Sequence, residues 1–519
     1  MIYLIAKKEF LNNIVTPMFI VGLALCLVLM PYTVYTGIQS YENRLTQYEN
    51  DIKSAEDVYQ KSQVYAQVNP IVVKPVSPLS IFSKGIVEQT GSKVRLDRKE
   101  KPVFSSDVVL LSENPFMGNF MSLDFITALT ILLSLLGVLF SYDMLSREKE
   151  QGTLKLSLSN PVSRSTFFLG KITGVFLTLL PILIICFLII FLIIQFSSSV
   201  HFTASDYGRI AMLILLSLVY FAFFVFLGGF ISSHTKSSTS SIIVNLFIWC
   251  FLLFLLPNAA SYLGKNITKA DDYKQMAFNI DEQIDQKEFW HNQYGEIQET
   301  VNNEGFQHVG YFVCSGGDCD GGHMIAFTPR STMEWERRFK ELINPVLLAN
   351  CDKKWAIQQD YLQQIYRQEK TVRYLSYLSP AEIFKQLSAL LCRTGMDSEV
   401  SFMDQVRLFQ DMYYEYFVQN KIYSSYAYFT PEKEENFTEN MEKSWDKFNK
   451  WKETINPESS FDFSALGYAD TSDFPRFHYV QPTLGNDLQS QLYLLAGILF
   501  VCLLFFWFSF VSFIKYDVR

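Results

Sequence analysis

Cysteine is the residue type whose placement in this sequence most directly indicates a chemistry. Four of the eight cysteines lie in the polar part of the chain, outside every long apolar run: Cys314, Cys319, Cys351 and Cys392. An even number of such cysteines favours disulfides if that part of the chain faces an oxidising compartment. Of the three possible pairings, we predict Cys314–Cys319, which closes a glycine-rich loop, and Cys351–Cys392, which ties two helices together.

The same loop offers a metal site as the alternative. Cys314, Cys319 and His323 follow the spacing Cys-x4-Cys-x3-His. A structural zinc ion takes four protein ligands, and Asp318 and Asp320 are poor substitutes for a fourth thiolate or imidazole. We therefore expect disulfide chemistry here and no metal site.

Catalytic side chains are present without a pattern that organises them. His291, His308, His323 and His478 lie in the polar part among many carboxylates, but no Gly-x-Ser-x-Gly, His-Glu-x-x-His or cysteine–histidine signature accompanies them. Residues 170–173, Gly-Lys-Ile-Thr, lack the upstream glycine of a phosphate-binding loop and lead into an apolar run. We expect no catalytic residue and no cofactor in this chain.

Six long apolar runs must position all of these residues. The chain has 519 residues, of which 49% are hydrophobic and 18% are charged. The hydrophobic residues are concentrated in segments 17–36, 121–141, 166–194, 207–231, 240–257 and 488–514. Because about 20 helical residues cross the roughly 30 Å hydrocarbon core of a bilayer, we predict a polytopic α-helical membrane protein with six transmembrane helices.

Basic residues near the ends of these runs predict the orientation. They are Lys7, Lys8, Arg147, Lys149, Lys155, Arg164, Lys171, Lys236, Lys515 and Arg519, and six spans place all of them on one side. Basic loops stay in the cytoplasm, so we expect both termini inside, in the inner membrane of a bacterium. The cytoplasmic parts are then segment 1–16, the loop 142–165, the short loop 232–239 and the tail 515–519.

Segments 37–120 and 258–487 are then extracytoplasmic. Segment 258–487 carries 23 Lys and Arg against 35 Asp and Glu, so the exterior is acidic and the inner face basic. This distribution fits a protein surrounded by membrane lipid and argues against nucleic acid as a partner. Three- and four-residue spacing of apolar residues predicts a mainly helical outer domain. Its most amphipathic stretch, 378–391, could pack inside the domain or lie on the outer leaflet.

The loop 142–165 is the cytoplasmic segment with a partner-binding pattern. Residues 147–151 are densely polar helix formers, Leu154 and Leu158 lie one turn apart, and Asn160-Pro161 should stop the helix. A short amphipathic helix of this kind inserts into a groove on a partner or lies on lipid headgroups. The periodicity leaves both readings open.

At these residues the sequence resembles a known family. Residues 148–154 (Glu-x-Glu-Gln-Gly-Thr-Leu), then 159–164 (Ser-Asn-Pro-Val-Ser-Arg) and Gly170-Lys171, resemble the coupling segment of ABC transporter permeases of type 2. Residues 6–11 with Pro17 resemble the amphipathic elbow helix before that family's first span. Four further stretches resemble a subgroup of this family that has a large extracytoplasmic insertion between the last two spans. They are Leu378–Ala381, Thr394-Gly395, Asp473–Phe477 and Lys515–Arg519.

The resemblance implies a non-catalytic membrane subunit that works as a dimer, paired with an identical or related permease copy. Each copy would dock on a separate ABC ATPase, which binds ATP and magnesium. The residues that it places against the ATPase are Arg147, Glu148, Glu150, Gln151, Gly152, Thr153, Leu154 and Leu158, with Lys7, Lys8 and Glu9 of the elbow nearby. The carboxylates would pair with basic groups of the ATPase, and Gly152 would allow a close backbone approach.

Two functions remain open at this point. In the first, the dimer exports an amphiphilic or lipid-linked substrate, which suits spans with few polar groups, Asn245 and Gln195 being the plainest. In the second, ATP-driven motion passes to the large outer domain and operates an extracytoplasmic partner while nothing crosses the membrane.

Overall fold

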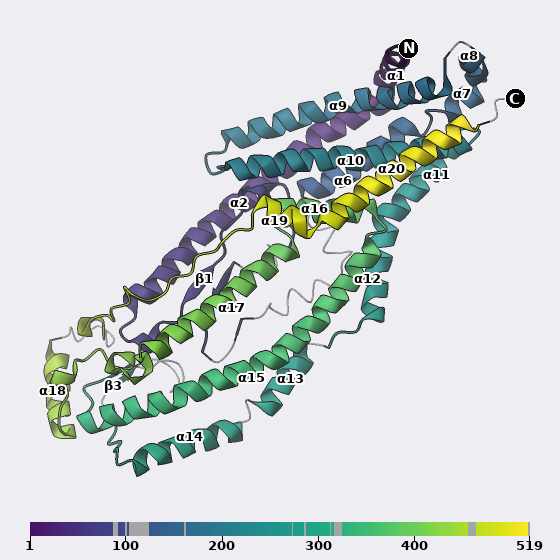
Figure 1. Ribbon diagram of the computed structural model, residues 1–519. Coiled ribbons are helices and arrows are strands. Elements are labelled where there is room, and N and C mark those ends of the chain that lie inside the picture. The colour runs from purple at the N-terminus through teal and green to yellow at the C-terminus, as the bar shows by residue number, and fades with distance from the viewer. Residues whose placement is uncertain are drawn as a thin grey trace.

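The fold is an elongated assembly of helices with two distinct ends. The computed structural model describes residues 1–86, 92–98, 101–102, 124–159, 162–271, 273–284, 287–311, 313–315, 324–454 and 463–516. In Figure 1 the N-terminus and the end of the last helix lie at one end of a helix bundle, which we call the terminal face. A second helical region, the distal domain, extends from the opposite end and contains most described residues of segments 37–120 and 258–487.

Within the part of the chain that the structure describes, six helices are long and apolar enough to cross a membrane, as the sequence predicts. They are α2 (Pro17–Lys61), α6 (Phe125–Ser141), α9 (Arg164–Phe196), α10 (Ala204–His234), the run from α11 (Ser238–Cys250) to α12 (Leu256–Ile267), and α20 (Leu492–Ile514). The chain is therefore a multi-pass helical membrane protein. The first predicted span, 17–36, is only the N-terminal part of α2, a helix of 45 residues that continues into the distal domain.

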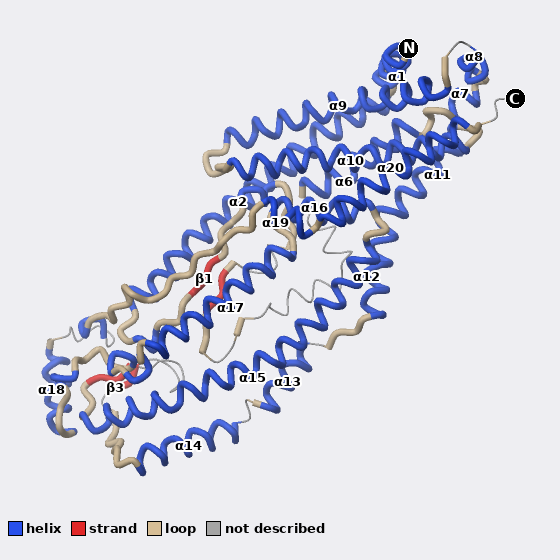
Figure 2. Tube along the Cα trace, viewed as in Figure 1, coloured by secondary structure: helices blue, strands red, loops and turns tan. Residues whose placement is uncertain are grey.

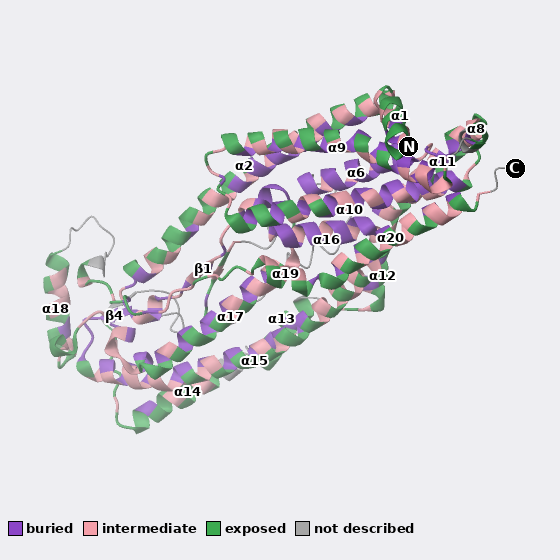
Figure 3. Cartoon of the chain, turned by 45° about the horizontal axis from the view of Figure 1, so that its top comes forward, coloured by how far each residue is buried: buried purple, intermediate pink, exposed green. Residues whose placement is uncertain are grey.

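Helices α6 and α10 form the centre of the bundle, and buried residues gather on them (Figure 3). Their backbones approach closely because each carries a glycine at the contact. A Cβ on Gly137 would meet Phe224 at 2.9 Å, and one on Gly228 would overlap Ser141. The hydroxyl of Tyr220 donates to the Thr130 carbonyl oxygen at 3.1 Å, so its polar group has a partner inside the apolar bundle.

The fifth span contains a π-helical turn, Phe251–Leu255, between α11 and α12. Pro257 lacks a backbone N–H and so cannot continue a regular α-helical ladder. Asn258 donates its side-chain amide to the Phe254 carbonyl at 2.7 Å, and Ser379 donates its hydroxyl to the Leu252 carbonyl at 2.7 Å. These two bonds satisfy carbonyls of the irregular turn, which allows the span to continue.

Helix α16 (Pro380–Cys392) corresponds to the amphipathic stretch 378–391, and it packs inside the protein. It contacts α6, α10 and α20 at the distal end of the bundle. Phe384 stacks on Tyr220 of α10 with ring centroids 4.5 Å apart. A helix that belongs to the distal segment therefore forms part of the core of the membrane bundle.

The distal domain is built on two long helices, the C-terminal part of α2 and α15 (Arg330–Ser376). Its other helices are α13 (Tyr273–Gln283), α14 (Lys287–Asn303), α17 (Met396–Gln419) and α18 (Met441–Glu453). Two small antiparallel sheets complete it (Figure 2): β1 (Ile71–Val73) with β2 (Lys93–Arg95), and β3 (Val313–Ser315) with β4 (Met324–Ala326). An aromatic core that includes Tyr413, Tyr428 and Phe429 holds these elements together.

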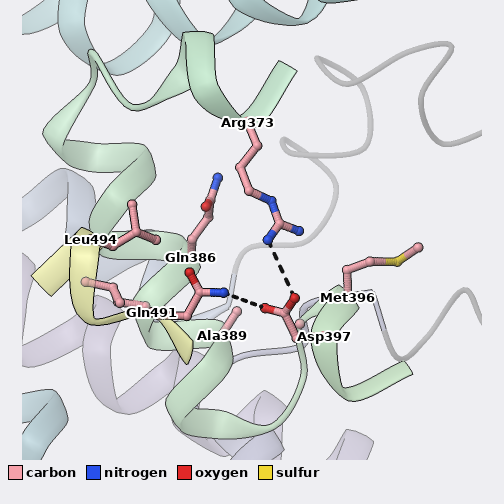
Figure 4. A pocket seen from close by; sticks show the side chains of 9 residues that line it. Arg373, Gln386, Ala389, Met396, Asp397, Gln491 and Leu494 are labelled. Atoms are coloured by element: carbon pink, nitrogen blue, oxygen red, sulfur yellow. Dashed lines mark hydrogen bonds and ion pairs between the residues drawn. The ribbon is translucent and has the colours of Figure 1, made fainter. Parts of the chain in front are cut away.

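The junction between the two parts depends on polar contacts. Figure 4 shows a pocket of about 70 Å³ where Asp397, at the start of α17, faces Arg373 of α15 at 3.6 Å. Gln491, just before α20, donates to Asp397 at 3.4 Å. Nearby, the fully buried Arg209 of α10 pairs with Asp487 of α19 (Leu484–Ser490) at 2.6 Å and donates to the carbonyls of Leu390 and Leu391.

The predicted disulfide between Cys351 and Cys392 is not formed. Cys392 belongs to the apolar core of the span bundle, whereas Cys351 lies in the middle of α15 in the distal domain. Both are free thiols and both are buried. A disulfide requires Cα atoms within about 7 Å, which their separate surroundings do not provide. Cys319 and His323, and the side chain of Cys314, lie outside the described residues.

We expect these two thiols to be reduced and slow to react. Burial raises the pKa of Cys351 to about 12 and also raises the pKa of Cys392, so little thiolate exists at pH 8. Maleimide should modify neither in the folded protein and both after denaturation without reductant, as read by peptide mass spectrometry. Recovery of the two peptides joined by a disulfide would contradict the structure, and a reduced sample is the control.

Candidate functional site: the coupling segment

The predicted coupling segment, residues 142–165, lies at the terminal face. It contains α7 (Ser146–Glu150) and α8 (Thr153–Ser159), which follow α6 directly. The first amides of α7 have no partner within their own helix. Ser232 of α10 supplies one, because its hydroxyl oxygen accepts the N–H groups of Leu145 at 3.0 Å and Ser146 at 2.9 Å. The fourth span therefore caps α7.

A buried ionic triad connects the coupling segment to two further helices. The ammonium group of Lys171, on α9, lies 2.8 Å from a carboxylate oxygen of Glu9 and 2.8 Å from one of Glu148. Glu9 belongs to the elbow helix α1 (Ile2–Ile14), and Glu148 belongs to α7. The three side chains are only 8%, 11% and 13% exposed. Because buried charges are expensive unless paired, this triad holds α1, α7 and α9 in one arrangement.

Two glycines bring the elbow helix close enough to form the triad. Gly170 and Gly174 lie one turn apart on α9, on the face that α1 covers. A Cβ on Gly174 would stand 2.5 Å from the Cβ of Glu9, and one on Gly170 would stand 2.8 Å from the Cβ of Ile5. Small residues at this spacing allow helices to pack at short range in a membrane.

Lys149 and Glu150 connect the same segment to the fourth and fifth spans. The Lys149 ammonium donates to the carbonyls of Ser232, Ser233 and Thr235, at the C-terminal end of α10. The Glu150 carboxylate accepts the Ser238 N–H at 2.9 Å, at the start of α11. Each charge lies at the helix end whose dipole favours it. Neighbouring residues of opposite charge therefore clamp the turn between the two spans.

Part of the segment around the turn from α7 to α8 is exposed at the terminal face. Gly152 adopts φ +72°, a left-handed conformation that glycine accepts without strain, and it turns the chain from α7 into α8. A Cβ built there would meet no atom within 4 Å. Arg147, Gln151 and Leu156 are also exposed. This surface can bind a partner, whereas the residues beneath it are already paired inside the chain.

A family comparison gives this surface its context. The family of ABC-2 family transporter proteins matches the chain over residues 3–518. The chain belongs to this family. No match was found among curated proteins. Members of the family are membrane components of ABC transporters, so this permease has ABC ATPase subunits as partners.

The structure separates the predicted coupling residues of the permease into two groups. Arg147, Glu150, Gln151, Gly152, Lys7 and Lys8 are exposed and Thr153 is partly so, whereas Glu148 and Glu9 are buried in the triad. Leu154 is 2% exposed and faces the permease core; the exposed leucine is Leu156, at 69%. The side chain of Leu158 and residues 160–161 lie outside the described residues.

Sequence reasoning missed the central role of Lys171. It appeared as one of several basic residues near a span end, in a false phosphate-loop match, and in the Gly170-Lys171 pair of the family resemblance, with no partner assigned to it. The available signal was a lysine one to two turns inside an apolar helix, which requires a carboxylate partner. Glu9 and Glu148 are 162 and 23 positions away in the sequence, so the pairing itself was not readable. Ser232 left no comparable signal.

We predict that Lys171→Met will destabilise the permease more than any exposed lysine change. The substitution leaves two neighbouring carboxylates buried without a cation, a loss of about 3–5 kcal/mol for removing one partner of a buried ion pair. Unfolding by SDS in mixed micelles measures it, with Lys155→Met as the exposed control. The triple variant Glu9→Gln, Glu148→Gln, Lys171→Met should recover much of the loss. Equal stability of Lys171→Met and wild type would refute the triad.

Proposed function

We propose that this protein is the transmembrane subunit of an ATP-driven exporter and that the coupling segment receives motion from a docked ABC ATPase. The docking surface is the exposed set Arg147, Gln151, Gly152 and Leu156, with Lys7 and Lys8 of the elbow at its edge. The ATPase binds ATP and magnesium; the permease contributes neither nucleotide site nor chemistry. One observation carries the proposal: the coupling segment contacts α9, α10 and α11 directly, and Lys171 of α9 connects it to α1.

The charge distribution supports a cytoplasmic terminal face. Lys7, Lys8, Arg147, Lys155 and Lys236 are exposed at this end of the bundle, in α1, the coupling segment and the turn before α11. The positive-inside rule assigns such a face to the cytoplasm, where ATPases reside. The distal domain then projects into the extracytoplasmic space of a bacterial inner membrane.

The exposed faces of the outer spans support a dimer in lipid. In the most apolar 18-residue stretch of each span, 17% of the residues of the fifth span and 22% of those of α20 are buried within the chain. The corresponding share for the second span is 72%. Phe247, Phe500 and Leu503 are among the exposed apolar residues on these two spans. Such faces are covered by lipid or by a second permease copy, identical or related.

We propose an amphiphilic or lipid-linked substrate because the described spans offer few polar side chains toward a path. Asn245 is buried and donates to the Ser241 carbonyl of its own helix. Trp249 donates to Ser134 at 2.9 Å, so these polar groups stabilise the bundle. An ion would need several polar ligands at membrane depth, whereas an apolar chain needs none.

A second candidate is mechanical transmission to an extracytoplasmic partner. The observation that favours it is α2, a single helix of 45 residues that runs from the first span into the distal domain. At 1.5 Å per residue it is about 68 Å long, so it can carry a tilt from the membrane to the far domain. Proteoliposomes that contain only the permease and its ATPase discriminate the two functions. ATP-dependent movement of a labelled amphiphile is expected for the exporter, and ATP hydrolysis with no movement supports transmission.

We predict that Gly152→Trp will abolish binding of the ATPase while Gly152→Ala will retain most of it. Both substitutions place a Cβ at φ +72° and share the backbone strain, but only tryptophan projects bulk from the exposed surface. Co-purification of the ATPase and its stimulated hydrolysis rate are the measurements, with the unfolding midpoint showing that both variants are folded. Equal ATPase binding by the two variants would remove Gly152 from the docking surface.

A further inference from the structure

A cavity of about 470 Å³ lies between α2 and the segment that follows β1. Three basic residues line it: Arg44 of α2, Lys74 after β1, and Arg393 at the end of α16. Most of the remaining lining is polar and neutral, from Thr36, Gln39, Ser40, Asn43, Gln47, Ser77, Ser80, Ser92 and Thr394. Among the described residues that line the cavity none is acidic, although segment 258–487 carries an excess of carboxylates.

The cations of this cavity are held in place by partners that lie behind the lining. Lys74 contacts the buried Glu399 at 2.5 Å, and Arg393 contacts Asp206 at 3.5 Å. Burial nevertheless lowers the pKa of Lys74, and burial together with the neighbouring Arg209 lowers the pKa of Arg393. The carboxylates therefore do not fully compensate the cost of burying these charges, and an anion in the cavity would reduce that cost.

Arg393 occupies a backbone position that usually selects glycine. It caps α16 with φ +58°, a left-handed conformation that is unfavourable for residues with a Cβ. Its guanidinium group donates to Gln481 at 2.6 Å, and within the described structure its Nε atom has no hydrogen-bond partner. Gly85, also at positive φ, packs against the carbonyl of Thr394 and so brings the 78–86 segment against the same turn. Residues at strained backbone positions cluster at ligand sites, which makes Arg393 a candidate contact for a ligand in the cavity.

The cavity lies at the distal boundary of the membrane bundle. Glu42 of α2 accepts hydrogen bonds from Ser197 and Ser199, in the loop that joins the third and fourth spans. The lining residues of α2 run from Thr36 to Gln47 and bracket this level. A lipid headgroup occupies the same depth, because it lies directly beyond the hydrocarbon core.

An apolar stripe leads from the membrane to the cavity along α2. Val21, Leu25, Val28 and Tyr32 are exposed and follow one another at three- and four-residue steps, and Thr36 of the cavity is the next position on this face. Along this face of α2, apolar residues are therefore followed by polar and basic ones. The change occurs at the depth where a lipid changes from acyl chain to headgroup.

We propose that this cavity binds the phosphate-bearing headgroup of an anionic lipid whose acyl chains lie along the α2 stripe. Arg44 and Arg393 contact the phosphate, and the surrounding hydroxyl and amide groups contact the rest of the headgroup. The proposal rests on the proposed exporter function, because a lipid bound in this cavity would be the exported substrate. The substrate class would then be a phosphorylated amphiphile. The binding itself needs neither ATP nor the ATPase, so it can fail or succeed separately from that function.

Native mass spectrometry of the purified full-length permease tests the proposal. Phosphatidylglycerol and phosphatidylcholine of the same chain length share the phosphate, so their comparison isolates the choline cation, which the described lining, with three basic and no acidic residues, repels. Added phosphatidylglycerol should therefore bind about tenfold more tightly than phosphatidylcholine. Arg44→Gln should remove this preference. Arg330→Gln, an exposed arginine of the distal domain, should retain it. Equal binding of the two lipids by the wild-type permease would overturn the proposal.

Two further arms address the alternatives. Asn43→Trp, an exposed position that lines the cavity, should block the anionic lipid without changing any charge or removing a buried contact. Inorganic phosphate should compete only weakly, because it lacks the acyl chains. Full competition by phosphate, retention of lipid by Asn43→Trp, or a lipid-free dimer whose second copy covers the stripe would each contradict the lipid assignment. Co-purification of the ATPase with Arg44→Gln shows separately whether the exporter assembly is intact.

Discussion

The buried contact of Lys171 with Glu9 and Glu148 is the interaction on which the terminal face depends. A lysine inside an apolar span is tolerated only with an anion beside it, and here two carboxylates from different helices converge on it. The elbow helix can reach α9 only because Gly170 and Gly174 remove the side chains that would separate them. The position of the coupling helix α7 then follows from the charge requirement, because Glu148 must remain with Lys171.

A similar constraint acts at the opposite end of the bundle. Arg209 is fully buried, pairs with Asp487 and donates to the last carbonyls of α16. The Leu390 carbonyl also accepts the Arg393 N–H, so the guanidinium group adds a second donor there and one at Leu391, where the helix end leaves carbonyls exposed. The α16 helix, although it comes from the distal segment, is thereby fixed among the spans.

Length and hydropathy were sufficient to predict the six spans, because a bilayer requires about 20 apolar residues per helix and few other structures do. They could not predict that α2 continues to Lys61, since the C-terminal half of this helix is polar and contacts elements far away in sequence. The loop 142–165 was identified from its local pattern. Its internal pairings were not, because Glu148 and Lys149 have the same appearance in sequence whether they face a partner or their own chain. The cysteine pairing failed for a related reason: an even count says nothing about distance, and Cys351 and Cys392 belong to different parts of the fold.

The two ends of the bundle meet on a single helix. Ser232 and the carbonyls around it, at one end of α10, bind the start of α7 and Lys149, while Arg209, near the other end, binds α16 and α19. Gly228 and Gly137 pack the same helix against α6 with no space for a side chain, so a displacement of α10 is passed to a closely packed neighbour. A push on the coupling segment would therefore act on α10 at Ser232 and reach the distal junction at Arg209. Either of the two proposed functions would require such a route, with the spans beside α10 separating in the exporter and the distal domain moving in mechanical transmission.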